Sequence, residues 1–179
     1  VDRVPPDAGE AVRLQLHAHR KLVRAVGLVG LELPHLPLDA EEGLHVVPEE
    51  RLGRGAVPGL SLAQNTLLTR SEPVRANSGW LDPARAHALA ARVIQRFRVK
   101  AAGPQAAARS LSGGNLQKFI MGREIDAQPK LLVVAQPTWG VDVGAAAQIR
   151  AELLALRDTG CAVLVISEDL DELFELSDR

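Results

Sequence analysis

The chain has 179 residues, of which 46% are hydrophobic, enough for one domain with a substantial core and a smaller appended subdomain. Its formal net charge of -1 argues against a nucleic-acid partner that is held by bulk electrostatics. No apolar run approaches the roughly 20 residues needed to cross a bilayer, and no signal-like segment opens the sequence, so we expect a soluble chain. The single cysteine, Cys161, lies in the apolar run CAVLVI and is predicted to be a core residue.

Residues 1–45 contain the weakest structural signals, with a Pro-rich start and an alternating piece, VRLQLHAH. We expect a strand or two and a connecting helix in this segment. His17 and His19 would share one face of that strand, which is a spacing suited to metal ligands. No Cys, Asp or third His nearby completes a site, so we predict no bound metal.

The next segment, from the strand-like HVVP to Arg109, predicts a small helical unit between two sheet-forming halves. A short buried strand and a Gly/Pro loop precede a helix opened at Ser61, with Gln64 at capping-box spacing. The pattern then stays helical to Arg109, and Asp82 and Pro83 are typical of the start of a second helix. An apolar stripe follows, made of Ala86, Leu89, Val93, Ile94 and Phe97.

The C-terminal part alternates strands and helices. The buried strand LLVVA precedes a helix, AAAQIRAELLALRDTG, that Gly160 closes. A second buried strand, CAVLVIS, precedes the helix EDLDELFELSD, for which Ser167 is the predicted cap, with Glu168 and Asp169 complementing the dipole of its first turn. This order predicts a parallel α/β unit, with functional residues just past the carboxyl ends of its strands.

The stretch SLSGGNLQK places Ser112, Gly113 and Gly114 at the start of an amphipathic helix. Backbone N–H groups are left uncovered there, at the positive end of the helix dipole. Such a turn can bind an anion, with Ser112 adding a hydroxyl donor. The same residues are also typical of an ordinary serine-capped helix, so the turn alone leaves both interpretations open.

Several motifs, in this order, resemble those of ATP-binding-cassette (ABC) ATPases. HVVPEERLGRGAVPGLSLAQN is similar to the Q-loop and the start of the helical subdomain, LSGGNLQK to the signature motif, LLVVAQPT to the Walker B strand, GVDVGA to the D-loop and VLVISEDL to the switch-histidine strand. The combination most resembles the second, C-terminal cassette of ATP-binding subunits of bacterial simple-sugar and nucleoside importers, over about residues 43–179. The family's glycine-rich phosphate loop, Walker A, occurs nowhere in the sequence.

This resemblance implies an α/β fold, a partial ABC-type nucleotide-binding domain with a P-loop-NTPase-like parallel sheet and an inserted α-helical subdomain. It divides the chain into a poorly matched segment, read as a remnant of the first half of the core, then the Q-loop region, the helical subdomain, and a last part with the signature helix, Walker B strand, D-loop and switch strand. These four parts are residues 1–45, 46–58, 59–110 and 111–179.

The resemblance also implies that the chain's own catalytic positions are degenerate. In the family the Walker B strand ends in an Asp that holds the magnesium shell and a Glu that polarises the attacking water. Ala135 and Gln136 stand at those positions here, Glu49 replaces the Q-loop glutamine and Glu168 the switch histidine. Alanine offers a metal no oxygen, an amide is a poor proton acceptor, and another carboxylate would repel a triphosphate. We therefore predict that this chain hydrolyses no ATP by itself.

Two cassettes of this family meet head to tail, so a module can lend its signature to the ATP of its partner. Ser112, Gly113, Gly114 and Asn115 would contact that ATP, and Asp142 in the D-loop would couple the two sites. The implied cofactor is ATP with Mg²⁺ in the composite site, with none for this chain alone. The implied partners are a second cassette, in the same polypeptide or a dimer, and membrane permease subunits that contact the Q-loop and helical subdomain. The implied location is peripheral, on the cytoplasmic side of the cell membrane.

Two alternative functions stay open. The chain could be a structural or interaction module without a nucleotide role, in which Ser-Gly-Gly is only a helix cap. It could also come from an ABC-type DNA-repair or chromosome-maintenance ATPase. Such proteins insert long heptad coiled coils, and the segment between the Q-loop and LSGGN has neither the length nor the heptads.

Overall fold

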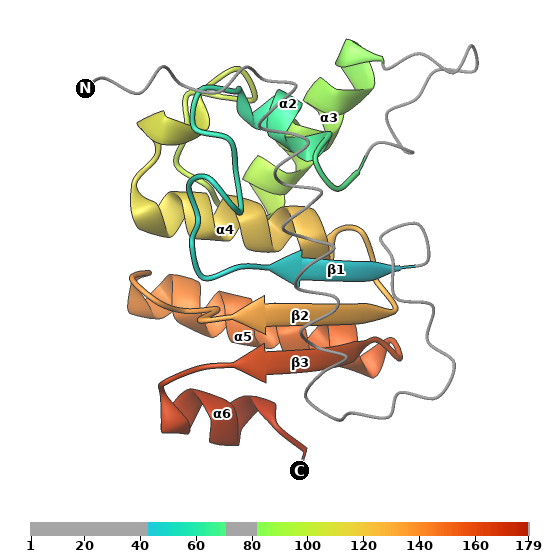
Figure 1. The fold of residues 1–179 in the computed structure, drawn as a ribbon, viewed down its shortest axis with the longest axis vertical. Coiled ribbons are helices and arrows are strands. Elements are labelled where there is room, and N and C mark those ends of the chain that lie inside the picture. Colours follow the sequence, from blue (N-terminus) through green and yellow to red (C-terminus); the bar gives the residue numbers. More distant parts are fainter. Residues whose placement is uncertain (1–42, 71–81, 179) are drawn as a thin grey trace.

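The computed structural model describes residues 43–70 and 82–178 (Figure 1). The strand and helix expected within residues 1–45, with His17 and His19, therefore lie outside the described residues except for the last three positions. In chain order the elements are β1 (Leu44–Val47), α2 (Leu62–Thr66), α3 (Pro83–Arg96), the 3-10 turn η3 (Ala108–Ser110), α4 (Gly113–Ile125), β2 (Leu131–Ala135), α5 (Val143–Asp158), β3 (Ala162–Ile166) and α6 (Leu170–Leu176).

The three described strands form a parallel sheet in the order β1-β2-β3, which confirms the predicted parallel α/β unit. Val133 of β2 pairs with Val46 of β1 and with Leu164 of β3. In Figure 1 α4 lies beside β1 and α5 lies behind β2 and β3, while α6 packs on β3 and α5. The carboxyl ends of the strands and the N-termini of α4 and α5 gather on one side of the sheet, on the left in Figure 1.

One apolar core joins the sheet to both of its covering helices. Its members share full or nearly full burial and include Val47, Leu116, Phe119, Ile120, Leu132, Val134, Ile149 and Leu153. Cys161 belongs to the same cluster and is 6% exposed, as predicted for a core residue. Each fully buried aliphatic or aromatic side chain stabilises the fold by about 1.5–3 kcal/mol relative to exposure, so this core fixes α4 and α5 on the sheet.

The helical unit lies beyond α4 and is formed by α2 and α3 (Figure 1). The expected capping box is present, with Gln64 N donating to Ser61 Oγ and Ser61 N donating to Gln64 Oε1. The Asp82 side chain accepts from Ala84 N at 2.9 Å, which confirms it as the cap ahead of Pro83. The predicted apolar stripe of α3 is buried, apart from a half-buried Ile94.

The expectation of helix up to Arg109 was wrong for the residues after α3. The helix ends at Arg96, and Arg98 has φ of 50°, a left-handed conformation that does not continue an α-helix. The following segment instead supplies acceptors to α2, because Leu62 N donates to Ala106 O and Ala63 N to Pro104 O, both at 2.9 Å. An irregular segment thus satisfies the N–H groups at the start of α2, which the helix itself cannot satisfy.

Helix α4 meets the helical unit through a glycine, and this contact gives a first prediction. A Cβ on Gly122 would lie 2.5 Å from Cδ2 of Phe97, whose ring is fully buried. Gly122→Ala should therefore lower the free energy of unfolding in urea by about 1–3 kcal/mol through overpacking, although alanine is the better helix former. Gly144→Ala in α5 is the matched control, because a Cβ there would come no closer than 3.4 Å to Asp142 Oδ1. Equal stability of both variants would contradict the prediction.

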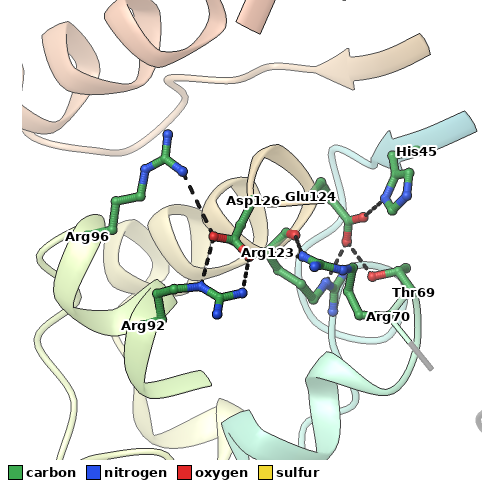
Figure 2. A network of polar contacts seen from close by, with 8 residues as sticks. All are labelled: His45, Thr69, Arg70, Arg92, Arg96, Arg123, Glu124 and Asp126. Atoms are coloured by element: carbon green, nitrogen blue, oxygen red, sulfur yellow. Dashed lines mark hydrogen bonds and ion pairs between the residues drawn. The ribbon is translucent and has the colours of Figure 1, made fainter. Parts of the chain in front are cut away.

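Two buried charges near the end of α4 tie the helix to several other segments (Figure 2). Arg123 donates to Gly55 O at 2.9 Å and to Asn65 O at 3.0 Å, and it also pairs with Glu124. Glu124 Oε2 accepts from His45 Nδ1 at 2.5 Å, and Oε1 accepts from Thr69 Oγ1 at 2.9 Å. Burial opposes ionisation of Glu124, but the Arg123 guanidinium and the hydrogen bond from His45 outweigh it and lower its pKa to about 2.

A second, more exposed cluster lies at the C-terminal end of the same helix (Figure 2). Asp126 Oδ2 accepts from Arg92 at 2.7 Å and from Arg70 at 3.2 Å. Partial burial raises the pKa of Asp126, yet the hydrogen bonds from Arg92 and Arg70 dominate and hold it below its usual value. Since Arg92 lies on α3 and Arg70 follows α2, these pairs attach the helical unit to α4, the helix that begins at the predicted signature turn.

Candidate functional site

The predicted signature turn is the exposed N-terminus of α4. Ser112 is the N-cap, and its Oγ accepts from Asn115 N at 3.4 Å and from Asn115 Nδ2 at 2.9 Å. Asn115 Oδ1 in turn accepts from Lys100 N at 2.8 Å, which fixes the amide. A serine hydroxyl has one proton to donate and accepts two hydrogen bonds, so Ser112 retains its donor for a ligand.

The two glycines of the turn leave room for their neighbours. A Cβ on Gly114 would lie 3.2 Å from the carbonyl oxygen of Gly140, and one on Gly113 would lie 3.0 Å from Nη1 of Arg51. Gly113 is exposed, and both residues stand in the first turn, where backbone N–H groups have no acceptor within the helix. The turn therefore presents N–H donors and a hydroxyl together at the positive end of a helix, as predicted.

The residue past β2, Gln136, connects the ends of two strands. It adopts φ of 50°, and its N–H donates to Ile166 O at 2.7 Å. Its side-chain Oε1 accepts from Glu168 N at 3.4 Å. The polar amide therefore bridges the loops that follow β2 and β3.

These groups do not fit a magnesium shell. Ala135 contributes a methyl group at the strand end, and the only side-chain oxygen of Gln136 is a neutral amide oxygen that faces the Glu168 N–H. Within residues 43–70 and 82–178 no group of three or more His, Cys, Asp or Glu side chains could hold a metal ion. Glu49 and Glu168 are both exposed.

The prediction that Ser167 caps the last helix, α6, was wrong. Asp169, not Ser167, is the N-cap, and its Oδ1 accepts from Asp171 N at 3.0 Å and Glu172 N at 3.2 Å. The Ser167 hydroxyl is otherwise engaged, because it donates to Glu172 Oε2 at 2.7 Å and accepts from Asp169 N. The acidic residues of the first turn are Asp171 and Glu172, so Glu168 lies before the helix.

Asp142, at the predicted D-loop position, is the N-cap of α5. Its Oδ1 accepts from Ala145 N at 2.8 Å, and this hydrogen bond is the main reason why the pKa of Asp142 is lowered. Two apolar side chains of the same segment are exposed, Trp139 at 66% and Val143 at 85%. Residues 139–143 therefore present apolar surface beside the predicted signature turn, since the Gly140 carbonyl lies next to Gly114.

Sequence reasoning missed two residues that hold this site together. Arg51, to which the sequence motifs assign no role, is half-buried and donates to Gln117 and to the carbonyl of Trp139. Burial lowers the pKa of Arg51 from its usual value. Gln117 is 1% exposed and donates to Pro137 O at 3.0 Å. Gln117 stands between Leu116 and Lys118, so its burial comes from tertiary packing and the local sequence carries no signal for it, while a buried amide needs partners.

Solved structures of ATP-binding cassettes share the fold of this chain. The chain resembles the dimeric post-hydrolysis state of the ATP-binding cassette MJ0796 bound to ADP and Pi, with a TM-score of 0.59 and 18% identity over 79% of this chain and 60% of that one. A nucleotide-free ATP-binding cassette from an ABC transporter matches with a TM-score of 0.55 and 21% identity, over 78% of this chain and 56% of that one. The architecture is thus that of part of an ABC-type nucleotide-binding domain, as the sequence predicted.

Curated relatives are import ATP-binding proteins. The chain is 45% identical over 140 residues to the nucleoside import ATP-binding protein NupA of Lactococcus lactis, 41% over 147 residues to the ribose import ATP-binding protein RbsA of a Chelativorans species, and 40% over 141 residues to the guanosine import ATP-binding protein NupO of Bacillus subtilis. These matches cover 78%, 80% and 78% of this chain, but 28% of each relative. No family model matches the chain. Its homologues are therefore ATP-binding proteins of sugar and nucleoside importers, and it spans little more than a quarter of their length.

None of the helices in the described parts of the chain combines the length and the apolar character that a membrane span requires.

Proposed function

We propose that this chain is a cassette module of a sugar or nucleoside ABC importer that donates its signature turn to the ATP of a partner cassette. The proposal also holds that the chain hydrolyses no ATP itself. The homologues support the importer class by their names. The observation on which the proposal depends is the asymmetry of the site, with an intact donor turn and a neutralised strand end.

The donor turn suits the γ-phosphate of a bound nucleotide. Ser112 retains its hydroxyl proton, and the N–H groups of Gly113 and Gly114 lie in the first turn of a 13-residue helix. Donors that are already in place stabilise developing charge without reorganisation, and losing one typically costs about 100-fold or more in rate. In this proposal the partner would hold ATP, whose γ-phosphoryl group passes to water with ADP as the leaving group, and Mg²⁺, which would neutralise the developing charge.

The end of β2 lacks the groups that would bind the metal ion and activate the attacking water. In place of a metal-binding Asp and a water-polarising Glu, the chain has the methyl group of Ala135 and an amide at Gln136 that is bonded to Glu168 N. The exposed carboxylate of Glu168 at the switch position would repel a triphosphate. We therefore assign these positions, with Glu49, to a degenerate site.

The proposed partners follow from the same surfaces. The second cassette would contact the signature turn and the neighbouring residues 139–143, where the apolar side chains of Trp139 and Val143 are exposed. Membrane permease subunits would contact the Q-loop region, residues 46–58, and the helical unit of α2 and α3. The chain would then lie peripherally on the cytoplasmic side of the membrane, and the D-loop Asp142 would couple the two sites.

A second candidate function is a structural or interaction module without a nucleotide role. The observation in its favour is that Ser112 does cap α4 through Asn115 N, as an ordinary N-cap would. A helix cap and a nucleotide-binding turn require the same local geometry, so only a measurement of ligand binding can distinguish the two roles.

A nuclear magnetic resonance titration tests the proposal. The ¹⁵N-labelled chain is mixed with an unlabelled cassette that has the phosphate loop and the Asp-Glu pair, first without nucleotide and then with ATP or ADP. We expect the amide signals of Gly113 and Gly114 to shift with ATP and the partner together, and much less with ADP, because only ATP brings a γ-phosphate to the turn. Signals that stay in place under all conditions would favour the interaction module.

A further inference from the structure

The loop after β1 extends one side chain to the signature turn. Arg51 Nε donates to Gln117 Oε1 at 3.0 Å, and Nη2 donates to the carbonyl of Trp139. We infer that Arg51 is a positioning residue, which holds the loop after β2 against the first turn of α4. This inference rests on the function proposed above and adds to it a residue outside the signature motif.

The backbone of Arg51 is fixed on the same helix that begins at the signature turn. Ala56 N donates to Arg51 O at 2.7 Å and Gly55 N donates to Glu50 O at 3.0 Å, so the loop closes on itself. A Cβ on Gly55 would lie 2.8 Å from Cδ1 of Ile120 in α4, which leaves room for no side chain there. The backbone at Arg51 is therefore held in place by hydrogen bonds within the loop and by packing against α4.

The guanidinium lies between the first turn of α4 and the loop after β2, two segments whose relative position the site must preserve. Its Nη1 is 3.0 Å from the position of a Cβ on Gly113 and 3.5 Å from that of one on Gly140. The two hydrogen bonds described above run to α4 on one side and to the loop after β2 on the other. A planar guanidinium can serve two such acceptors at once with its fixed fork, whereas a lysine ammonium provides only a point charge on a flexible stem.

Gln117 adds a second link between the same two segments. Its Oε1 accepts from Arg51, while its Nε2 donates to Pro137 O at 3.0 Å and lies 3.4 Å from Gln136 O. The loop after β2 is thus held through the carbonyls of residues 136, 137 and 139. Because the Gly140 carbonyl lies beside Gly114, a displacement of this loop would press on the signature turn or withdraw from it.

Steady-state ATPase kinetics of the paired cassettes test the inference. We expect Arg51→Lys and Arg51→Ala to lower kcat by about 10- to 100-fold, the loss typical of a small misplacement of reacting groups. The KM for ATP should not change, because the donors would be misplaced for the transition state while the partner still binds the nucleotide. Arg157→Ala is the control arginine, because Arg157 stands in the last turn of α5, outside the signature turn, the Q-loop region and the helical unit, and forms surface pairs with Asp158 and Asp178.

A readout on the chain alone separates positioning from mere stabilisation. In Arg51→Lys the amide signals of Gly113, Gly114 and Gly140 should shift while the Tm stays near that of the wild type. Wild-type kcat in Arg51→Lys would overturn the inference, as would a loss of kcat that only follows a lowered Tm. Ser112→Arg is measured alongside: if it abolishes turnover while both Arg51 variants remain active, the inference alone fails. If Ser112→Arg is silent as well, the proposed function fails.

Discussion

Replacing Ser112 by arginine should lower the ATPase rate of the proposed cassette pair by about 100-fold or more. The substitution removes the hydroxyl donor and the cap of α4, and it places a long side chain where the turn would receive the partner's nucleotide. Ser112 is exposed, so the variant should fold. The cost of the lost cap is about 1 kcal/mol, which urea unfolding would measure separately.

Gln136→Asn provides the comparison at the end of β2, which we propose to be degenerate. Asparagine tolerates the left-handed backbone of this position, φ of 50°, so the change shortens the amide without forcing the loop. We expect this variant to turn over ATP at nearly the wild-type rate, because no proton transfer is assigned to Gln136. A large loss in Gln136→Asn with full activity in Ser112→Arg would reverse the proposed roles of the two positions.

Replacing Glu124 by glutamine should lower the free energy of unfolding by about 3–5 kcal/mol. The substitution leaves the Arg123 guanidinium, only 1% exposed, without its carboxylate. It also replaces one of the two oxygens that accept from His45 and Thr69 by an amide NH2, which only donates. Domains are stable by only about 5–15 kcal/mol, so this change would remove a large part of the total. Urea unfolding followed by circular dichroism measures it.

The matched control is Glu152→Gln, which removes the carboxylate of a surface pair with Arg96. The loss there should stay near 0–1 kcal/mol, roughly the range of exposed ion pairs. A similar loss in both variants would show that burial of the Glu124 network does not matter.

The same network predicts a dependence of stability on pH. The pKa of Glu124 falls from 4.5 to about 2 on folding, so its contribution is complete above pH 4.5 and is lost as the pH falls toward 2. The shift corresponds to about 3 kcal/mol. The wild-type chain should therefore lose more stability than Glu124→Gln across this window in unfolding experiments at several pH values, whereas parallel curves would contradict the assignment.

Local patterns were sufficient where neighbouring residues decide the structure. The Ser61 capping box, the start of α3 at Asp82 and Pro83, and the cap of α4 at Ser112 depend on side chains that bond within the same turn. The buried strand β2 followed from its continuous apolar residues. The expectation that β3 is also buried was wrong, because Ala162 and Ile166 are exposed and the strand lies at an edge of the described sheet. At the start of α6 both Ser167 and Asp169 are suitable cap residues, and Asp169 is the cap while the Ser167 hydroxyl donates to Glu172.

The sequence by itself determined the motif order, the parallel α/β pattern and the residues at the signature turn, because each is encoded within a short stretch. Only the tertiary structure decided which distant groups hold that turn in place. Arg51 meets Gln117 and the Trp139 carbonyl, and His45 meets Glu124, across long stretches of sequence. Periodicity and capping rules describe neighbours along the chain, whereas these contacts arise when the loop after β1, the sheet and α4 pack together and each buried polar group must find a partner.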